Sequence, residues 1–214
     1  MSPAKLEVRD LRVSFAGHPV ASVPELDVDG GEIVGLAGES GSGKSMTILA
    51  VLGLAGTAGA AVTGSVRLDG QELIGLSAAE AAARADTAMR SVLLPPELLD
   101  RYPAQLSGGQ LQRVAIALAL ALRAEVLLAD EPTSALDVTV QAEVLELLRE
   151  LRDSRGMAVL FVSHDLAVIA ELCDRVAIMR AGQVVEQGPT GQVIAAPRHD
   201  YTRELLAAVP RLGE

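Results

Sequence analysis

Aromatic residues and cysteine are scarce in this sequence, and long apolar runs are missing. Aromatic side chains make up only 2% of the 214 residues, so Leu, Val, Ile and Ala must fill the core. Cys173 is the single cysteine, which excludes a disulfide within the chain and favours a small buried side chain. The longest apolar stretch, Val114 to Leu122, is far shorter than the roughly 20 residues that a membrane-spanning helix needs. No amino-terminal signal sequence is visible, so we expect a soluble or peripheral protein.

Basic residues are also fewer than acidic residues. The chain has 18 Lys and Arg against 28 Asp and Glu, and the net charge of −10 argues against a nucleic-acid partner. Only Lys5 and Lys44 of these 18 residues are lysines, and the other 16 are arginines. We therefore expect Lys44 to occupy a position where a slim ammonium fits and a forked guanidinium does not.

The order of apolar and polar segments predicts one α/β domain over residues 1–214. We expect half-buried strands at 6–8 and 11–15, buried strands at 33–37, 126–129 and 158–162, a short strand at 66–68, and a hairpin of 176–179 with 184–185. We expect helices at 44–54 and 110–122, and a further helix that opens with a capping box at 77–80. Two more helices are expected, one near 140–155 that ends at Gly156 and one that Asp200 caps and that runs through Val209. Residues 53–64 read as a loop. The core sheet should be largely parallel, with an antiparallel β-layer at the amino-terminal end.

A phosphate loop is the first motif that carries chemistry. The pattern G-x-x-x-x-G-K-[ST] is met by Gly38, Glu39, Ser40, Gly41, Ser42, Gly43, Lys44 and Ser45. A predicted strand precedes this segment and a predicted helix follows it, as the motif requires. Backbone N–H groups and the helix amino terminus would bind phosphates, Lys44 would reach the β- and γ-phosphates, and Ser45 would ligate Mg²⁺. The alternative is a glycine-rich turn that ends in a helix cap.

Two further predicted strands end in polar side chains. Asp130 and Glu131 follow the apolar residues 126–129, which places both carboxylates in the ligand crevice of a parallel sheet. We expect Asp130 to hold Mg²⁺ and Glu131 to polarise the attacking water, whereas an acidic pair alone would indicate a solvated loop. His164 follows the apolar residues 159–162, and a lone histidine at a strand end is more often a structural hydrogen-bonder. However, the run Val162-Ser163-His164-Asp165 resembles the switch segment of ABC ATPases, and this resemblance implies that His164 contacts the γ-phosphate. His18 and His199 have no such setting and are expected at the surface.

A second glycine motif, Leu106-Ser107-Gly108-Gly109-Gln110, lies between the phosphate loop and the acidic pair. Together these motifs resemble the ATP-binding subunit of an ABC transporter over nearly the whole chain. The resemblance implies a P-loop NTPase core that binds ATP and Mg²⁺ and works as a head-to-tail dimer. In that dimer Ser107, Gly108, Gly109 and Gln110 would bind the nucleotide of the partner, and the Ser134–Asp137 segment would be the interface loop. The resemblance also assigns nucleotide contacts to Phe15, Met46 and Asp137, although Phe15 would serve equally well as a core aromatic at a strand end.

Further segments resemble the peptide/nickel group of ABC importers, without distinguishing dipeptide, oligopeptide and nickel cargo. These are Glu39-Ser40, residues 137–142 and residues 200–210. The chain departs from the family where a glutamine-containing loop and a helical subdomain are expected, because no Gln lies between Gln71 and Gln105. The segments 84–89 and 92–102 look like the two sides of a deletion near Arg90, so the helical subdomain is predicted to be shortened around 84–106.

The resemblance implies the ATP-hydrolysing subunit of a peptide or nickel importer, at the cytoplasmic face of the plasma membrane. Its partners would be a second ATP-binding subunit, two permease subunits and, indirectly, a solute-binding protein. One alternative is an ABC-type ATPase of DNA repair or chromosome maintenance, but such proteins carry long coiled-coil insertions or basic surfaces, and this sequence shows neither. Another is a non-transporting, uncoupled nucleotide-binding dimer, against which the retention of the predicted hydrolytic residues argues.

Overall fold

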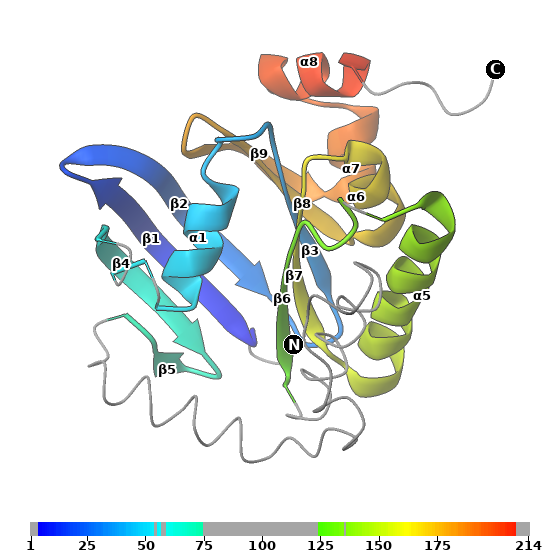
Figure 1. Ribbon diagram of the computed structural model, residues 1–214, viewed down its shortest axis with the longest axis horizontal. Helices are drawn as coiled ribbons and strands as arrows, with labels where there is room; N and C mark the ends of the chain where they lie inside the picture. The colour runs from blue at the N-terminus through cyan, green and yellow to red at the C-terminus, as the bar shows by residue number, and fades with distance from the viewer. Residues whose placement is uncertain (1–3, 54, 57–58, 75–123, 135, 209–214) are drawn as a thin grey trace.

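The computed structural model describes residues 4–53, 55–56, 59–74, 124–134 and 136–208, and shows one mixed β-sheet flanked by helices (Figure 1). The strands are β1 (Leu6–Phe15), β2 (His18–Val28), β3 (Ile33–Ala37), β4 (Ala61–Leu68), β5 (Gln71–Glu72), β6 (Val126–Asp130), β7 (Ala158–Ser163), β8 (Arg175–Arg180) and β9 (Gln183–Pro189). The helices are α1 (Lys44–Val51), α5 (Val138–Arg155), α6 (Leu166–Leu172), α7 (Thr190–Ala195) and α8 (Asp200–Ala208).

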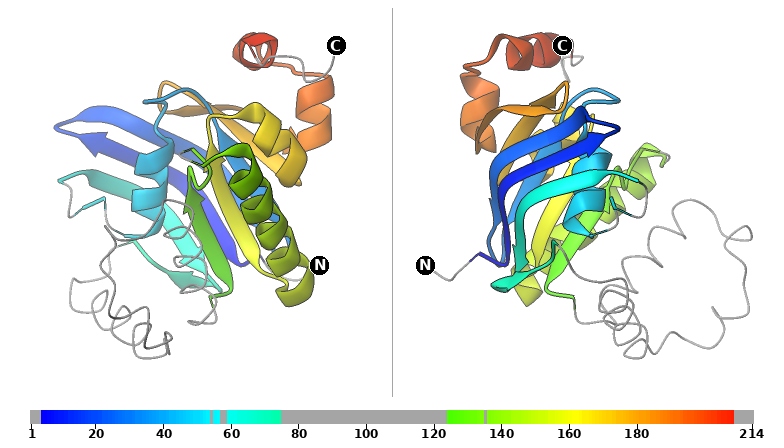
Figure 2. Two further views of the ribbon diagram at one scale, coloured as in Figure 1. Left: turned by 45° about the vertical axis from the view of Figure 1, so that its right-hand side comes forward. Right: turned by 90° about the vertical axis from the view of Figure 1, so that its left-hand side faces the viewer.

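The strand order β5-β4-β1-β2-β9-β8-β3-β7-β6 divides the sheet into two parts. Strands β8, β3, β7 and β6 pair parallel with one another, whereas β9 pairs antiparallel with β8, and β1 pairs antiparallel with both β2 and β4. The two further views show the antiparallel strands curving away from the parallel ones (Figure 2). The predicted α/β fold with an amino-terminal antiparallel layer is therefore confirmed.

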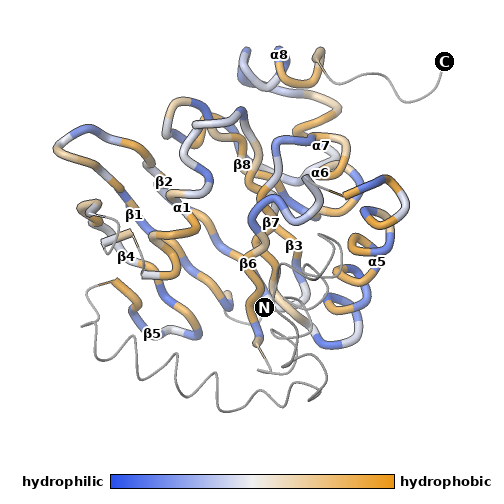
Figure 3. The backbone as a smooth tube through the Cα atoms, viewed as in Figure 1, coloured by the Kyte–Doolittle hydropathy of each residue, from blue (hydrophilic) through white to orange (hydrophobic). Residues whose placement is uncertain are grey.

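Hydrophobic side chains cover both faces of the parallel strands. On one face of β3, Val34 and Leu36 belong to a core shared with Ile48 and Val51 of α1. On the other face, Ile33 and Ala37 belong to a core shared with α5 and α6, including Val144, Leu148 and Ile169. Figure 3 shows that the central strands are mainly hydrophobic, whereas hydrophobic and hydrophilic residues alternate along α5, which is the pattern of a surface helix. Burial of both faces is what a parallel sheet requires.

Three local expectations were wrong. The strands predicted at 6–8 and 11–15 are one strand, β1, which bridges the break with Asp10 at φ +48° and a register shift against β4. The loop predicted at 53–64 ends earlier, because Ala61 and Val62 pair with β1. Asp200, which was predicted to cap the last helix, is instead the first residue of α8. The residue before it, the half-buried His199, accepts a hydrogen bond from the N–H of Tyr201 through Nδ1, as a cap residue does.

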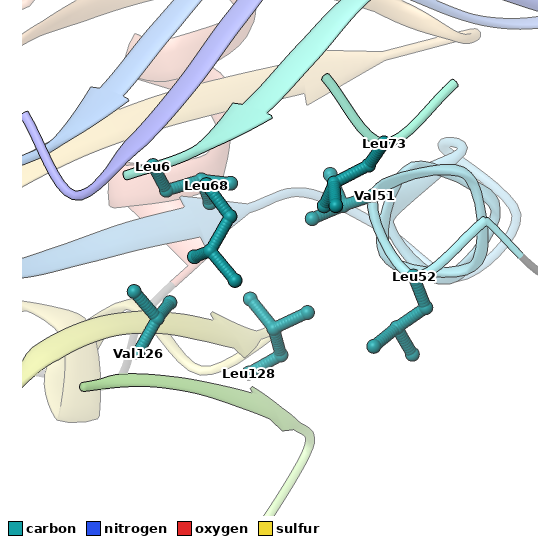
Figure 4. A pocket seen from close by; sticks show the side chains of 7 residues that line it. All are labelled: Leu6, Val51, Leu52, Leu68, Leu73, Val126 and Leu128. Atoms are coloured by element: carbon teal, nitrogen blue, oxygen red, sulfur yellow. The ribbon is translucent and has the colours of Figure 1, made fainter. Parts of the chain in front are cut away.

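An apolar cavity of about 310 Å³ lies at the end of α1 far from the phosphate loop. Leu6 and Leu68 face Val126 and Leu128 across it, as Figure 4 shows, and Val51, Leu52 and Leu73 complete the lining. The lining offers no side-chain hydrogen-bond donor or acceptor, so this cavity is unsuited to phosphate. Among the described residues, no helix is both long and apolar enough to cross a membrane.

Cys173 is expected to be inert in the folded protein. It is 7% exposed, and its Sγ lies so close to β3 that a Cβ at Gly35 would be 3.0 Å away. Burial raises the pKa of the Cys173 thiol far above its usual value, and the neighbouring Asp174 adds to this. Because the thiolate is the reactive species, a thiol reagent at pH 8 should label the unfolded chain quickly and the folded chain only slowly. Rapid labelling of one equivalent in native buffer would contradict this packing.

Candidate functional site

The carboxyl ends of three parallel strands meet at one edge of the sheet. Ala37 of β3 pairs with Ser163 of β7, and Asp130 of β6 pairs with Val162 of β7. The chain leaves the sheet directly after these positions at Gly38, Glu131 and His164. In a parallel sheet, this edge is where ligands bind. The structure therefore brings the predicted phosphate loop, acidic pair and histidine to one edge.

Two glycines allow the phosphate loop to pass close to its neighbours. Gly38 has a φ of +153°, and a Cβ there would lie 2.2 Å from the carbonyl oxygen of Met179. Gly43 has a φ of +105°, and a Cβ there would lie 2.6 Å from the carbonyl oxygen of Val20. Both separations are too short for a side chain, and left-handed φ values favour glycine. The path of the loop therefore depends on glycine at both positions.

Lys44 is folded into the loop. It is 5% exposed, and its Nζ donates to the carbonyl oxygens of Gly38 and Glu39, both at 2.8 Å. An ammonium has three N–H donors, so one remains for a phosphate oxygen. Burial lowers the pKa of Lys44, and the nearby charges of Glu131 and Asp130 oppose that lowering. The ammonium of Lys44 and the carboxylates of Glu131 and Asp130 are therefore close enough to interact electrostatically.

Helix α1 begins at Lys44, next to this ammonium. Gly43 is its N-cap, and no side chain accepts a hydrogen bond from the first turn. The N–H groups of that turn have no intrahelical partner, and the helix dipole adds positive potential. Ser45 is exposed at this end and Met46 is half-buried. An anion is therefore favoured here by backbone donors as well as by Lys44.

Glu131 and His164 are in contact. Nδ1 of His164 lies 3.1 Å from Oε1 of Glu131, and the two side chains are 57% and 35% exposed respectively. Glu131 has a φ of +46°, which is uncommon for a residue with a side chain, and its N–H donates to the carbonyl oxygen of Val162 at 2.9 Å. Strained backbone of this kind is concentrated at functional sites. The sequence had singled out each residue but gave no indication that they touch.

The donors at this edge fit a nucleotide and Mg²⁺. The loop presents backbone N–H groups and an ammonium to phosphates, while the Ser45 hydroxyl and the exposed Asp130 carboxylate are oxygen ligands of the type that Mg²⁺ takes. No group of three acidic, His or Cys side chains among the described residues could hold a metal. A Mg²⁺ bound to nucleotide needs only one or two protein oxygens, because phosphates and water complete its shell.

Other predicted site residues lie apart or outside the described chain. Phe15 is half-buried at the end of β1, with its ring near Gly59. Asp137 caps α5, where its carboxylate accepts from the N–H of Val140 at 2.9 Å. Residues 107–110 lie outside the described residues, as do the segments 84–89 and 92–102. Sequence reasoning also missed Tyr201, whose hydroxyl reaches the phosphate loop.

Comparison with known proteins agrees with this geometry. A profile of the ABC transporter family matches residues 22–92 and 76–134, two pieces that overlap just before and around the predicted junction near Arg90. The glutathione import ATP-binding protein GsiA of Pectobacterium atrosepticum is 41% identical over 271 aligned positions. Because this chain has only 214 residues, GsiA carries residues in the matched region that this chain lacks.

The match to this chain covers different fractions of the relatives' own lengths. The match spans 100% of this chain but 44% of GsiA. The probable D,D-dipeptide transport ATP-binding protein DdpD of Escherichia coli is 37% identical, with 100% of this chain and 80% of DdpD covered. Among solved structures, the ATP-binding cassette MJ0796 bound to ADP and Pi has a TM-score of 0.67 and 25% identity over 86% of this chain and 98% of that one. The chain therefore belongs to the ABC transporter family, among its ATP-binding domains.

Proposed function

We propose that this chain binds and hydrolyses MgATP as the ATP-binding subunit of an ABC importer of peptides. The contact between Glu131 and His164, at the edge that also holds Lys44, carries the hydrolytic part of the proposal. The import part rests on relatives named for import of glutathione and transport of D,D-dipeptides. Those names favour peptides over nickel as the cargo. We take the domain to extend over residues 1–214, with its helical subdomain shortened around 84–106.

In the proposed reaction, water attacks the γ-phosphorus in line with the bond to ADP. The carboxylate of Glu131 orients this water and accepts its proton as the new P–O bond forms and the bond to the bridging oxygen breaks. His164 holds Glu131 through the 3.1 Å contact and contacts the γ-phosphate. Lys44 and the first turn of α1 stabilise the charge on the phosphate oxygens. Mg²⁺, when held by Ser45 and Asp130, supplies further positive charge.

The proposed assembly is a head-to-tail dimer beneath two permease subunits, peripheral to the cytoplasmic face of the membrane. Ser107, Gly108, Gly109 and Gln110 of one subunit would bind the γ-phosphate held by the other, with Asp137 at the interface. Phe15 would stack on adenine, and Glu39, Ser40, Gly41, Ser42 and Met46 would line the phosphates. A solute-binding protein would deliver the cargo. We propose no nucleic-acid partner, because the net charge of −10 would repel phosphate backbones.

An uncoupled ATPase is the second candidate, and the shortened segment favours it. A partner can shift an equilibrium only through differential contacts. By the family resemblance, the shortened segment is the one that would dock on a permease. On this second candidate, the chain hydrolyses MgATP with little response to a permease. The measurement is the ATPase rate in proteoliposomes, with and without a permease pair and a loaded binding protein.

A chimera separates the two candidates. The chimera carries the glutamine loop and helical segment of a close relative, inserted between Met89 and Arg90. If the chain is an importer subunit, this insertion should restore stimulation of the ATPase rate by cargo. The parent chain, without the insertion, is the control. Strong stimulation of the parent chain would show that coupling uses another surface. A folded chimera without stimulation would favour the uncoupled enzyme.

A further inference from the structure

We propose that Tyr201 of α8 is a positioning residue of the phosphate loop, which it holds through the backbone of Glu39. The N–H of Glu39 donates to Oη of Tyr201 at 3.2 Å, across 162 positions of sequence. Tyr201 is 2% exposed, so its hydroxyl cannot exchange this partner freely for water. The inference rests on the proposed function in one respect, which is that the loop binds nucleotide.

Glu39 is held from two sides. Its carbonyl oxygen accepts from Nζ of Lys44 at 2.8 Å, inside the loop, while its N–H is bound by Tyr201. The β8–β9 turn adds a further contact, because the N–H of Gly182 donates to the carbonyl oxygen of Ser42 at 2.9 Å. The loop is thus supported by residues near the carboxyl end of the chain.

Tyr201 is itself well fixed. The guanidinium of Arg180 lies over its ring at 4.6 Å from the centroid, a cation–π distance. Nδ1 of His199 accepts from the N–H of Tyr201 at 3.1 Å. The carboxylate of Glu186 in β9 accepts from the N–H groups of Arg198 and His199, at 2.8 and 3.0 Å. These contacts attach the start of α8 to β8 and β9, near the turn from β3 into α1 (Figure 1 and Figure 2).

The contact connects two segments that the sequence singled out separately. Glu39 belongs to the phosphate loop and Tyr201 to residues 200–210. The observed contact of the Tyr201 hydroxyl is with the loop backbone, so we assign Tyr201 no catalytic role. Its effect passes through the orientation of the loop backbone, whose N–H groups must remain directed inward to bind an anion. Loss of the acceptor would leave the Glu39 N–H without this partner.

The test replaces Tyr201 with phenylalanine, which keeps the ring and its stacking with Arg180. We expect the Kd and the KM for ATP to rise roughly fivefold, the effect of one hydrogen bond, with kcat within about twofold. The amide of Glu39 should exchange its hydrogen faster in the nucleotide-free protein, as measured by NMR. Glu204→Gln is the matched control, because Glu204 is exposed on the same helix, and it should change none of these values.

Amide exchange and nucleotide affinity of the Tyr201→Phe protein together test the positioning role. Faster exchange of the Glu39 amide with an unchanged Kd would mean that Tyr201 is only structural and would overturn the proposal. Unchanged exchange would overturn it as well. If Tyr201→Phe weakens nucleotide binding but the wild-type chain hydrolyses no ATP, the positioning role stands and the proposed function fails. If the wild-type chain binds no nucleotide, both fail.

Discussion

Replacement of Glu131 with glutamine is expected to slow MgATP turnover by about two to four orders of magnitude and to leave ATP affinity nearly unchanged. The amide keeps the shape of the side chain, and its oxygen can still meet Nδ1 of His164 at the observed position. It cannot accept a proton from water. An interaction made only in the transition state lowers kcat without weakening binding. Phosphate release and equilibrium binding of ATP measure the two quantities.

Glu150→Gln is the matched control, because it makes the same change of charge at an exposed position of α5. It should turn over ATP at the wild-type rate. Wild-type hydrolysis by the Glu131→Gln protein would remove Glu131 from its assigned role. A loss of ATP binding in the same protein would instead indicate that the carboxylate holds the left-handed turn at this residue.

The Glu131→Gln protein should also reveal the proposed dimer. If two ATP molecules are shared between opposed phosphate loops and the glycine motifs at 107–110, ligand binds the dimer and favours it by mass action. Slow hydrolysis lets this state accumulate. Sedimentation at saturating MgATP should then give a dimer mass, whereas the protein without nucleotide should be a monomer. A mass that stays monomeric would argue against shared sites, or show that the shortened segment disables them.

Replacement of Lys44 with alanine is expected to weaken ATP binding by about 10- to 100-fold, the range for hydrogen bonds to a charged group. The ammonium is buried, and its two contacts to the carbonyls of Gly38 and Glu39 place it inside the loop. Lys44→Arg should not restore binding, because a guanidinium is wider than the ammonium and offers a fixed fork of donors. Equilibrium titration with ATP measures the loss.

Lys5 provides the control, since it is the only other lysine of the chain. Its Nζ pairs with Asp69 and Glu125 at the opposite end of the sheet, on partly exposed side chains. Solvent-exposed ion pairs contribute little to stability, so Lys5→Ala should fold and bind ATP normally. Equal losses in both variants would indicate a general effect of charge and would contradict a specific role for Lys44.

Local sequence determined much of this protein. Strand β3 lies at the predicted residues 33–37, and α5 ends at Gly156, which adopts a φ of +62° as a C-cap. These features were predictable because apolar periodicity, glycine and the phosphate-loop pattern act over a few residues. By contrast, β4 begins at Ala61 within a glycine- and alanine-rich stretch because β1, some 50 positions earlier, supplies its hydrogen bonds. A pairing partner at that distance leaves no local signal.

Tertiary structure decided which of the chemically active residues meet. Glu131 touches His164 because β6 and β7 are neighbours in the sheet, with Asp130 opposite Val162. Tyr201 reaches Glu39 because α8 is attached to β8 and β9, which place it beside the phosphate loop. The kinds of residue and their position at strand ends follow from local patterns. Their contacts follow from strand order and helix docking, which are set by the burial of both sheet faces across the whole chain.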